Sequence, residues 1–157
     1  MIINNIDFEI KEDHPILHLS EIDKAYIAGL VDGEGCFGLY KTMPTSNPLA
    51  TFTIGMTDEK IIRWLFKIIG YLGDIQERLR KGNRKDIWQL RITSNQCLLF
   101  TSSILPYLKI KDKQARIIIQ HHLIITGRSK YQPYSKEEQE GLTFLQMDIT
   151  KLNQRGK

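Results

Sequence analysis

Two acidic residues, Asp32 and Glu34, alternate with two glycines in the stretch GLVDGEGCFG, between a helix-like apolar run and a strand-like run. A carboxylate at the end of a helix is held rigidly, and glycines beside it allow a phosphate or a second backbone to approach closely. Mg²⁺ prefers hard oxygen ligands such as carboxylates and carbonyls. The pattern therefore favours a metal site for phosphodiester cleavage. One glutamate supplies too little charge for two metal ions, whereas two copies of the motif would supply enough.

Two other interpretations of this stretch fail on its context. GEGCFG, residues 33–38, matches the pattern GxGxxG, but a dinucleotide-binding site needs a strand before the glycines and a helix after them. The order here is reversed. An EF-hand starting at Asp32 needs an oxygen ligand at its fifth position, which is Cys36.

Hydrophobic periodicity predicts the elements that must position these acids. Residues 1–18 form an N-terminal arm, and Ser20 begins a helix that ends near Asp32. Strands are expected at 36–42, 50–56, 74–81 and 87–92, and further helices begin at Thr57, Asn95, Asp112 and Ser135. The order helix, hairpin, helix, hairpin, helices (αββαββα) indicates an α+β fold with a curved antiparallel sheet. We expect one domain over residues 1–157, with a core at 19–126 and a C-terminal helix at 135–153.

Alternation along the strands separates a core face from an outer face. Ile75 and Leu79 are expected in the core, and Glu77 is expected to point inward with them. The turn RLRKGNRK holds five basic residues in eight positions. Arg and Gln side chains can read base edges, and the major groove admits a two-stranded ribbon, so the outer face predicts DNA contacts. An ordinary solvated sheet face is the alternative. The expected DNA-binding residues are Gly38, Tyr40, Thr42, Thr51, Thr53, Gln76, Arg78, Arg80, Lys81, Arg84, Gln89, Arg91 and Lys113.

Composition limits the class of protein. The chain has 157 residues, 41% of them hydrophobic, and a net charge of +4, which leans toward an anionic partner such as nucleic acid. Its two cysteines do not make a disulfide framework, which favours an intracellular site. No apolar run approaches the roughly 18 residues of a membrane-spanning helix, so no membrane partner is expected.

Three stretches resemble the LAGLIDADG homing endonucleases, in the branch with a single copy of the motif. IAGLVDGEG, residues 27–35, closely resembles the nine-residue signature. LPYLKIKDKQA, residues 105–115, resembles a second stretch of that branch, and TDEKIIRWL, residues 57–65, matches the start of its second helix. The resemblance covers most of residues 20–125 and implies a homodimer.

The resemblance implies roles for individual residues. Glu34 stands at the metal-binding acid, and Gly33 supplies a backbone carbonyl beside the metal. Lys111 stands at the basic residue near the scissile phosphate. Asp58 stands where relatives often carry a polar side chain that positions water; an acid there departs from the pattern. Ile62 occupies a position that is polar or basic in some relatives.

A dimer interface is expected on the motif helix. Gly29, with Ala25 and Ala28, makes a face small enough for two backbones to approach. Asp32 is expected to cap or hydrogen-bond at the junction of the two helices, which brings both Glu34 residues to the dimer axis.

The function implied by the resemblance is a site-specific double-strand cut in a long, roughly palindromic DNA site. Mg²⁺ is the expected cofactor, and Mn²⁺ or Ca²⁺ can occupy the same site. Such enzymes are encoded in mobile introns or inteins. A maturase that binds intron RNA, and a DNA-binding regulator that has lost cleavage, are the alternatives. The expected compartment is intracellular, either a prokaryotic cytoplasm or an organelle interior, which the sequence does not distinguish.

Overall fold

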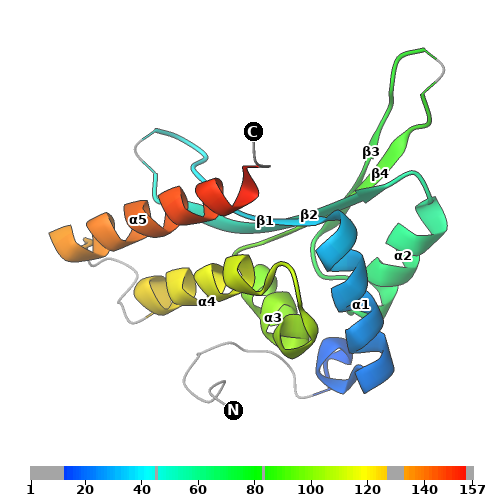
Figure 1. Ribbon diagram of the computed structural model, residues 1–157, viewed down its shortest axis with the longest axis horizontal. Helices are drawn as coiled ribbons and strands as arrows, with labels where there is room; N and C mark the ends of the chain where they lie inside the picture. The colour runs from blue at the N-terminus through cyan, green and yellow to red at the C-terminus, as the bar shows by residue number, and fades with distance from the viewer. Residues whose placement is uncertain (1–12, 45, 83, 127–132, 155–157) are drawn as a thin grey trace.

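A computed structural model of the chain describes residues 13–44, 46–82, 84–126 and 133–154 (Figure 1). Residues 1–12 of the expected N-terminal arm lie outside the described residues. Two short 3-10 helices, five α-helices and four strands follow one another along the described part of the chain. They are η1 (Pro15–His18), α1 (Glu21–Glu34), β1 (Gly35–Tyr40), β2 (Leu49–Met56), α2 (Glu59–Ile68), β3 (Asp74–Arg78), β4 (Ile87–Thr93), α3 (Ser94–Ile104), η2 (Leu105–Tyr107), α4 (Asp112–Thr126) and α5 (Lys136–Asn153).

The four strands form one antiparallel sheet in the order β1-β2-β4-β3. The two hairpins thus lie side by side, with β2 and β4 in the centre. Helices α1, α2, α3 and α4 lie on one side of the sheet, and the β3–β4 hairpin rises away from the body on the other (Figure 1). This arrangement leaves one face of the sheet without helical cover over its central strands.

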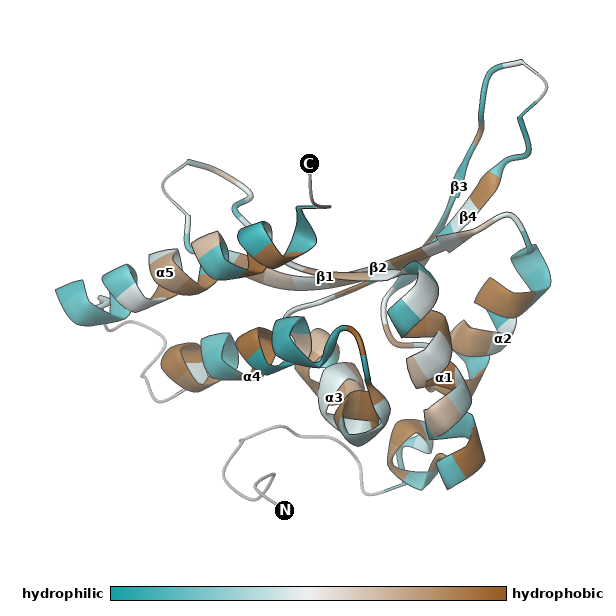
Figure 2. Ribbon diagram, in the orientation of Figure 1, coloured by the Kyte–Doolittle hydropathy of each residue, from teal (hydrophilic) through white to brown (hydrophobic). Residues whose placement is uncertain are grey.

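The core lies between the sheet and the helices. Phe37 of β1, Phe52 of β2 and Phe100 of α3 are fully buried, with ring centroids 5.0 Å and 4.6 Å apart in successive pairs. Apolar residues on α1 and α2 lie toward this layer, as the hydropathy colouring shows (Figure 2). Burial of these side chains is the main favourable contribution to stability.

Helix α5 covers the outer edge of β1, the edge that has no neighbouring strand. The side-chain amide of Asn153 donates to the Phe37 carbonyl at 2.7 Å, and that of Gln146 donates to the Leu39 carbonyl at 3.1 Å. These carbonyls alternate along the strand and point away from β2. Because an uncovered strand edge can pair with another chain, α5 protects the sheet from edge-to-edge association. Its N-terminus carries a capping box, Ser135 with Glu138.

The predicted α+β class, element order and antiparallel sheet are confirmed, with shifted boundaries. Helix α1 continues two residues beyond Asp32, to Glu34, and Pro15–His18 form a 3-10 helix. Within the described residues no helix is long and apolar enough to cross a membrane.

Two expectations about the second hairpin are wrong. Strand β3 ends at Arg78, and Leu79 is 77% exposed, since no helix lies beneath the hairpin tip. Glu77 is exposed for the same reason. Asp74 is exposed and shares its face with Gln76 and Arg78, so the outer face of the sheet also carries an acid.

Candidate active site and nucleic-acid interface

The motif forms a continuous turn from helix to strand. Helix α1 ends at Glu34, and Gly35 is already the first residue of β1. A β-carbon at Gly35 would lie 2.8 Å from both the Phe52 ring and the Val31 carbonyl oxygen, so only glycine fits this close approach. The turn thereby fixes where the last helical side chain leaves the backbone.

Asp32 ties this turn to a segment almost 80 residues away. Its carboxylate accepts hydrogen bonds from the backbone N–H groups of Lys109, Ile110 and Lys111 at 2.8, 3.2 and 2.9 Å. Hydrogen bonds to a charged acceptor are stronger than neutral ones. The expectation that Asp32 caps a junction between two helices of a dimer is therefore corrected: both its oxygens hold the loop before α4.

Lys111 is brought to the same end of α1 by this anchor. Its Nζ donates to the backbone carbonyl of Asp32. An ammonium group has three donors, so two remain for another acceptor. The structure thus brings Lys111 to the end of the helix that terminates at Glu34.

Glu34 is exposed, and its side chain makes no hydrogen bond or ion pair with any described residue. Gly33 is exposed as well, and a β-carbon there would meet nothing within 4 Å. A free carboxylate and an open backbone carbonyl are oxygen ligands of the kind Mg²⁺ takes, and one carboxylate alone is too few. These residues fit a metal site that a second carboxylate must complete.

Asp58 has a structural partner of its own. Its side chain is the N-cap of α2 and accepts from the backbone N–H groups of Lys60 and Ile61 at 2.9 and 3.4 Å. The geometry therefore gives Asp58 a role in helix capping, and its expected catalytic role stays a prediction. Ile62 is fully buried in the core, and Arg63 pairs with Glu59 at 2.5 Å.

The residues of α1 that face away from the core differ in part from those expected at the dimer interface. Ala25 and Gly29 are exposed, and a β-carbon at Gly29 would meet nothing within 4 Å. Ala28 is 0% exposed and belongs to the chain's own core, so its expected place at an interface is wrong. Two large apolar residues that the expected interface did not include lie on the same exposed stripe of α1: Ile22 is 81% exposed and Tyr26 is 51% exposed. They precede Gly29 by seven and three residues, the spacing that places side chains on one face of a helix.

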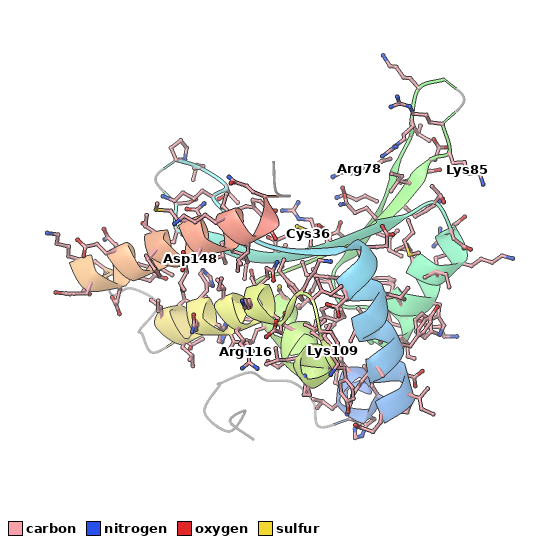
Figure 3. All side chains as sticks on the ribbon, in the orientation of Figure 1. Cys36, Arg78, Lys85, Lys109, Arg116 and Asp148 are labelled. Atoms are coloured by element: carbon pink, nitrogen blue, oxygen red, sulfur yellow. The ribbon has the colours of Figure 1, made fainter. Side chains whose placement is uncertain are left out.

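The outer face of the sheet is built of cross-strand rows. Thr53 of β2 lies opposite Arg91 of β4, and Gln89 lies opposite Gln76 of β3. Arg78 is exposed at the end of β3 and points toward the space over the outer face (Figure 3). These side chains form the polar surface that alternation predicted.

Other predicted DNA contacts lie elsewhere. Thr51 is 2% exposed, and its hydroxyl bonds to the Leu49 carbonyl. Gly38 is buried because the Tyr40 ring lies over it, where a β-carbon would be 2.4 Å from the ring. Burial, and then the neighbouring Cys36, raise the pKa of Tyr40 above its ordinary value. The expected DNA contacts at Thr51 and Gly38 are therefore corrected, because both residues are buried and cannot reach a duplex.

The remaining predicted contacts surround the sheet. Arg80, Lys81 and Arg84 lie in the loop between β3 and β4, and Thr42 lies just beyond β1; all four are exposed. Lys113 is exposed in the first turn of α4, a helix that lies on the covered side of the sheet. It therefore does not belong to the outer face.

Comparison with solved structures identifies the fold. Homing endonuclease I-CvuI, in complex with the I-CreI target DNA, matches with a TM-score of 0.68 and 20% identity over 87% of this chain and 85% of that chain. The archaeal intron-encoded homing endonuclease I-Vdi141I, complexed with DNA, matches with a TM-score of 0.68 and 15% identity over 87% of each chain.

A longer protein of the same kind also matches. The LAGLIDADG meganuclease I-AabMI, bound to uncleaved DNA, has a TM-score of 0.59 and 20% identity over 78% of this chain but only 43% of its own. No protein-family model matches the sequence, and a search of curated proteins finds no match. The chain has the fold of the LAGLIDADG homing endonucleases, which confirms the resemblance at the level of the fold.

Proposed function

We propose that this protein is a homodimeric, Mg²⁺-dependent DNA endonuclease that makes a double-strand cut at a long, roughly palindromic site. The observation that carries the proposal is the Asp32 anchor. It brings a lysine ammonium from the loop before α4 to the end of α1, where an exposed, unpaired Glu34 ends the helix. The fold shared with DNA-bound homing endonucleases supports it.

Glu34 and the Gly33 carbonyl would hold the metal ion. When bound, Mg²⁺ supplies positive charge that stabilises the attacking and leaving oxygens of the phosphodiester. Lys111 offsets charge that develops on the phosphate, using the donors not bonded to the Asp32 carbonyl. Asp32 is a positioning residue because it acts through the loop that carries Lys111.

The second carboxylate comes from a second copy of the chain. The exposed α1 stripe of Ile22, Ala25, Tyr26 and Gly29 ends at the Glu34 turn. Packing two such stripes together buries two large apolar side chains on each helix and brings the two Glu34 turns near the dimer axis. The coverage values support two units per assembly, since this chain spans 43% of I-AabMI but 85% of I-CvuI.

The outer face of the sheet binds the duplex. Arg91, Gln89, Gln76 and Thr53 offer groups that reach base edges, and the basic residues of the β3–β4 loop reach phosphates. The dimer would place one such surface on each half of the site, which is why the site should be roughly palindromic.

Cleavage of a DNA library tests the proposal. Duplexes with two randomised, inverted half-sites are incubated with the protein and Mg²⁺, and the new ends are sequenced. We expect a defined family of cut sequences, and no cut when Mg²⁺ is removed by a chelator. Glu34→Gln should lower cleavage at least about a thousandfold without weakening binding, because the amide lacks the charge that holds the metal.

The control is the same change at Glu140, an exposed residue of α5, which should leave cleavage unchanged. Sequence-specific binding with no cleavage by the wild type would contradict the nuclease proposal and indicate a binding protein. Full cleavage by the Glu34→Gln variant would remove Glu34 from the metal site.

A further inference from the structure

His121 and His122 are consecutive residues of α4, and they line a cavity of about 230 Å³. The cavity is formed by the residues entering β2, the start of α3, α4 and Tyr134. Its lining includes neither Glu34 nor Lys111, so it is separate from the proposed active site. The two histidines are only 1% and 2% exposed.

Each histidine has a nitrogen without a hydrogen-bond partner in the part of the chain that the structure describes. The Nε2 atom of His121 lies 2.7 Å from the Pro48 carbonyl oxygen, which can only accept, so Nε2 carries the proton and Nδ1 carries a lone pair. Among the described residues, Nδ1 of His121 and Nε2 of His122 are buried and bond to nothing. Buried polar atoms are almost always paired, so these two indicate a partner such as water or an ion.

The bonding of His121 is the arrangement found in metal-binding histidines. Such a histidine donates one ring N–H to a backbone carbonyl or carboxylate, which fixes the ring and directs the other nitrogen to the metal. Asn47, Ser94 and Asn95, whose side chains carry oxygen atoms, also line the cavity. Burial lowers the pKa of both histidines below the ordinary value, which keeps the lone pairs available near neutral pH.

We propose that His121 Nδ1 and His122 Nε2 are the nitrogen ligands of a site for a divalent transition-metal ion, such as Zn²⁺ or Ni²⁺. Within the described part of the chain no group of three or more His, Cys, Asp or Glu side chains could hold a metal, so water or cavity oxygens complete the coordination. Imidazole suits Zn²⁺ and Ni²⁺, whereas Mg²⁺ requires oxygen ligands. The ion would brace α4 against the segment at Pro48 that leads into β2.

Thermal denaturation of the full chain, freed of metal by a chelator and then titrated with ZnSO₄ or NiCl₂, tests the site. An ion that binds only the folded state should raise Tm by about 5–10 °C at a hundredfold excess over Kd. Calorimetry should give one ion per chain. His121→Gln and His122→Gln should each abolish the rise, and the same change at His18, an exposed residue outside the cavity, should preserve it.

A rise in Tm that survives in both variants, or an equal rise with MgCl₂, would overturn the proposal. Because a buried variant can fail to fold, nitrogen NMR of the wild-type histidines gives a second measurement. Metal should shift His121 Nδ1 and His122 Nε2, and shifts confined to His14 and His18 would contradict the site. Neither measurement uses DNA, so either result is independent of the proposed nuclease activity.

Discussion

The C-terminal end of α1 and the tip of the β3–β4 hairpin both present charged side chains, but the chain holds them differently. At α1, Asp32 accepts three backbone hydrogen bonds and Lys111 bonds to its carbonyl. At the hairpin tip, the backbone N–H of Arg80 donates one hydrogen bond to the Asp86 carboxylate, and the nearby Leu79 is exposed. Chemistry requires groups held in a fixed geometry, whereas contact with a duplex tolerates side chains that adjust.

The largest effect on stability is expected from removing the Asp32 anchor. Asp32→Ala deletes the acceptor of three hydrogen bonds and should lower the free energy of unfolding by about 3 kcal/mol. Cleavage should fall at least a hundredfold even under conditions where the variant is folded, because Lys111 is no longer held. Urea denaturation and cleavage rates measure the two losses.

Asp148→Ala is the matched control, since the Asp148 side chain makes no hydrogen bond with the described residues, and it should change stability by less than about 0.5 kcal/mol. Equal stability of the Asp32→Ala variant and the wild type would show that the α1 end is no better anchored than the hairpin tip.

Gly29→Leu tests the exposed face of α1. A bulky side chain would separate two packed helices, so sedimentation should show a monomer at concentrations where the wild type is a dimer. Because nothing lies within 4 Å of a β-carbon at Gly29, the substitution should not disturb the folded monomer. A tight dimer in this variant would place the interface on another surface.

The outer face should contain two kinds of contact. Arg91, in the central strand β4, should contact a base, so Arg91→Ala should cost about 1–3 kcal/mol and relax preference at one position per half-site. Arg84, in the hairpin loop, should contact phosphate, so Arg84→Ala should weaken all sequences alike. In this variant the slope of log binding constant against log salt concentration should become shallower by about one per lost contact. The two kinds of contact are distinguished by measuring how each variant binds a set of single-base site variants at two salt concentrations. Wild-type affinity and preference in both the Arg91→Ala and the Arg84→Ala protein would indicate a solvated face.

The smallest effect concerns the cysteines. Burial raises the pKa of Cys97 to about 12, so at pH 8 almost none of it is thiolate and it should resist alkylation. Cys36, half-buried on the outer face opposite Thr53, should react, and target DNA should slow its reaction. Mass spectrometry of peptides after brief alkylation measures both rates. Faster modification of Cys97 would contradict its burial.

Periodicity predicted the elements because core contacts repeat along each strand and helix. Phe37 of β1 and the alternating Phe52 and Ile54 of β2 are all buried in the core. The role of Asp32 could not be predicted this way, because its partners lie 77 to 79 residues away and bond through backbone N–H groups, which have no sequence signature. Thr51 has the outward parity but is buried, since alternation gives a face and says nothing of what covers it.

Crystals of the complex with a cleavable DNA target, grown with Mn²⁺ in place of Mg²⁺, would locate the metal by its anomalous scattering. We expect a peak at coordination distance from the Glu34 carboxylate and the Gly33 carbonyl, beside the duplex at the dimer axis. A peak elsewhere on the protein, or two Glu34 residues far apart in the complex, would contradict the proposed active site.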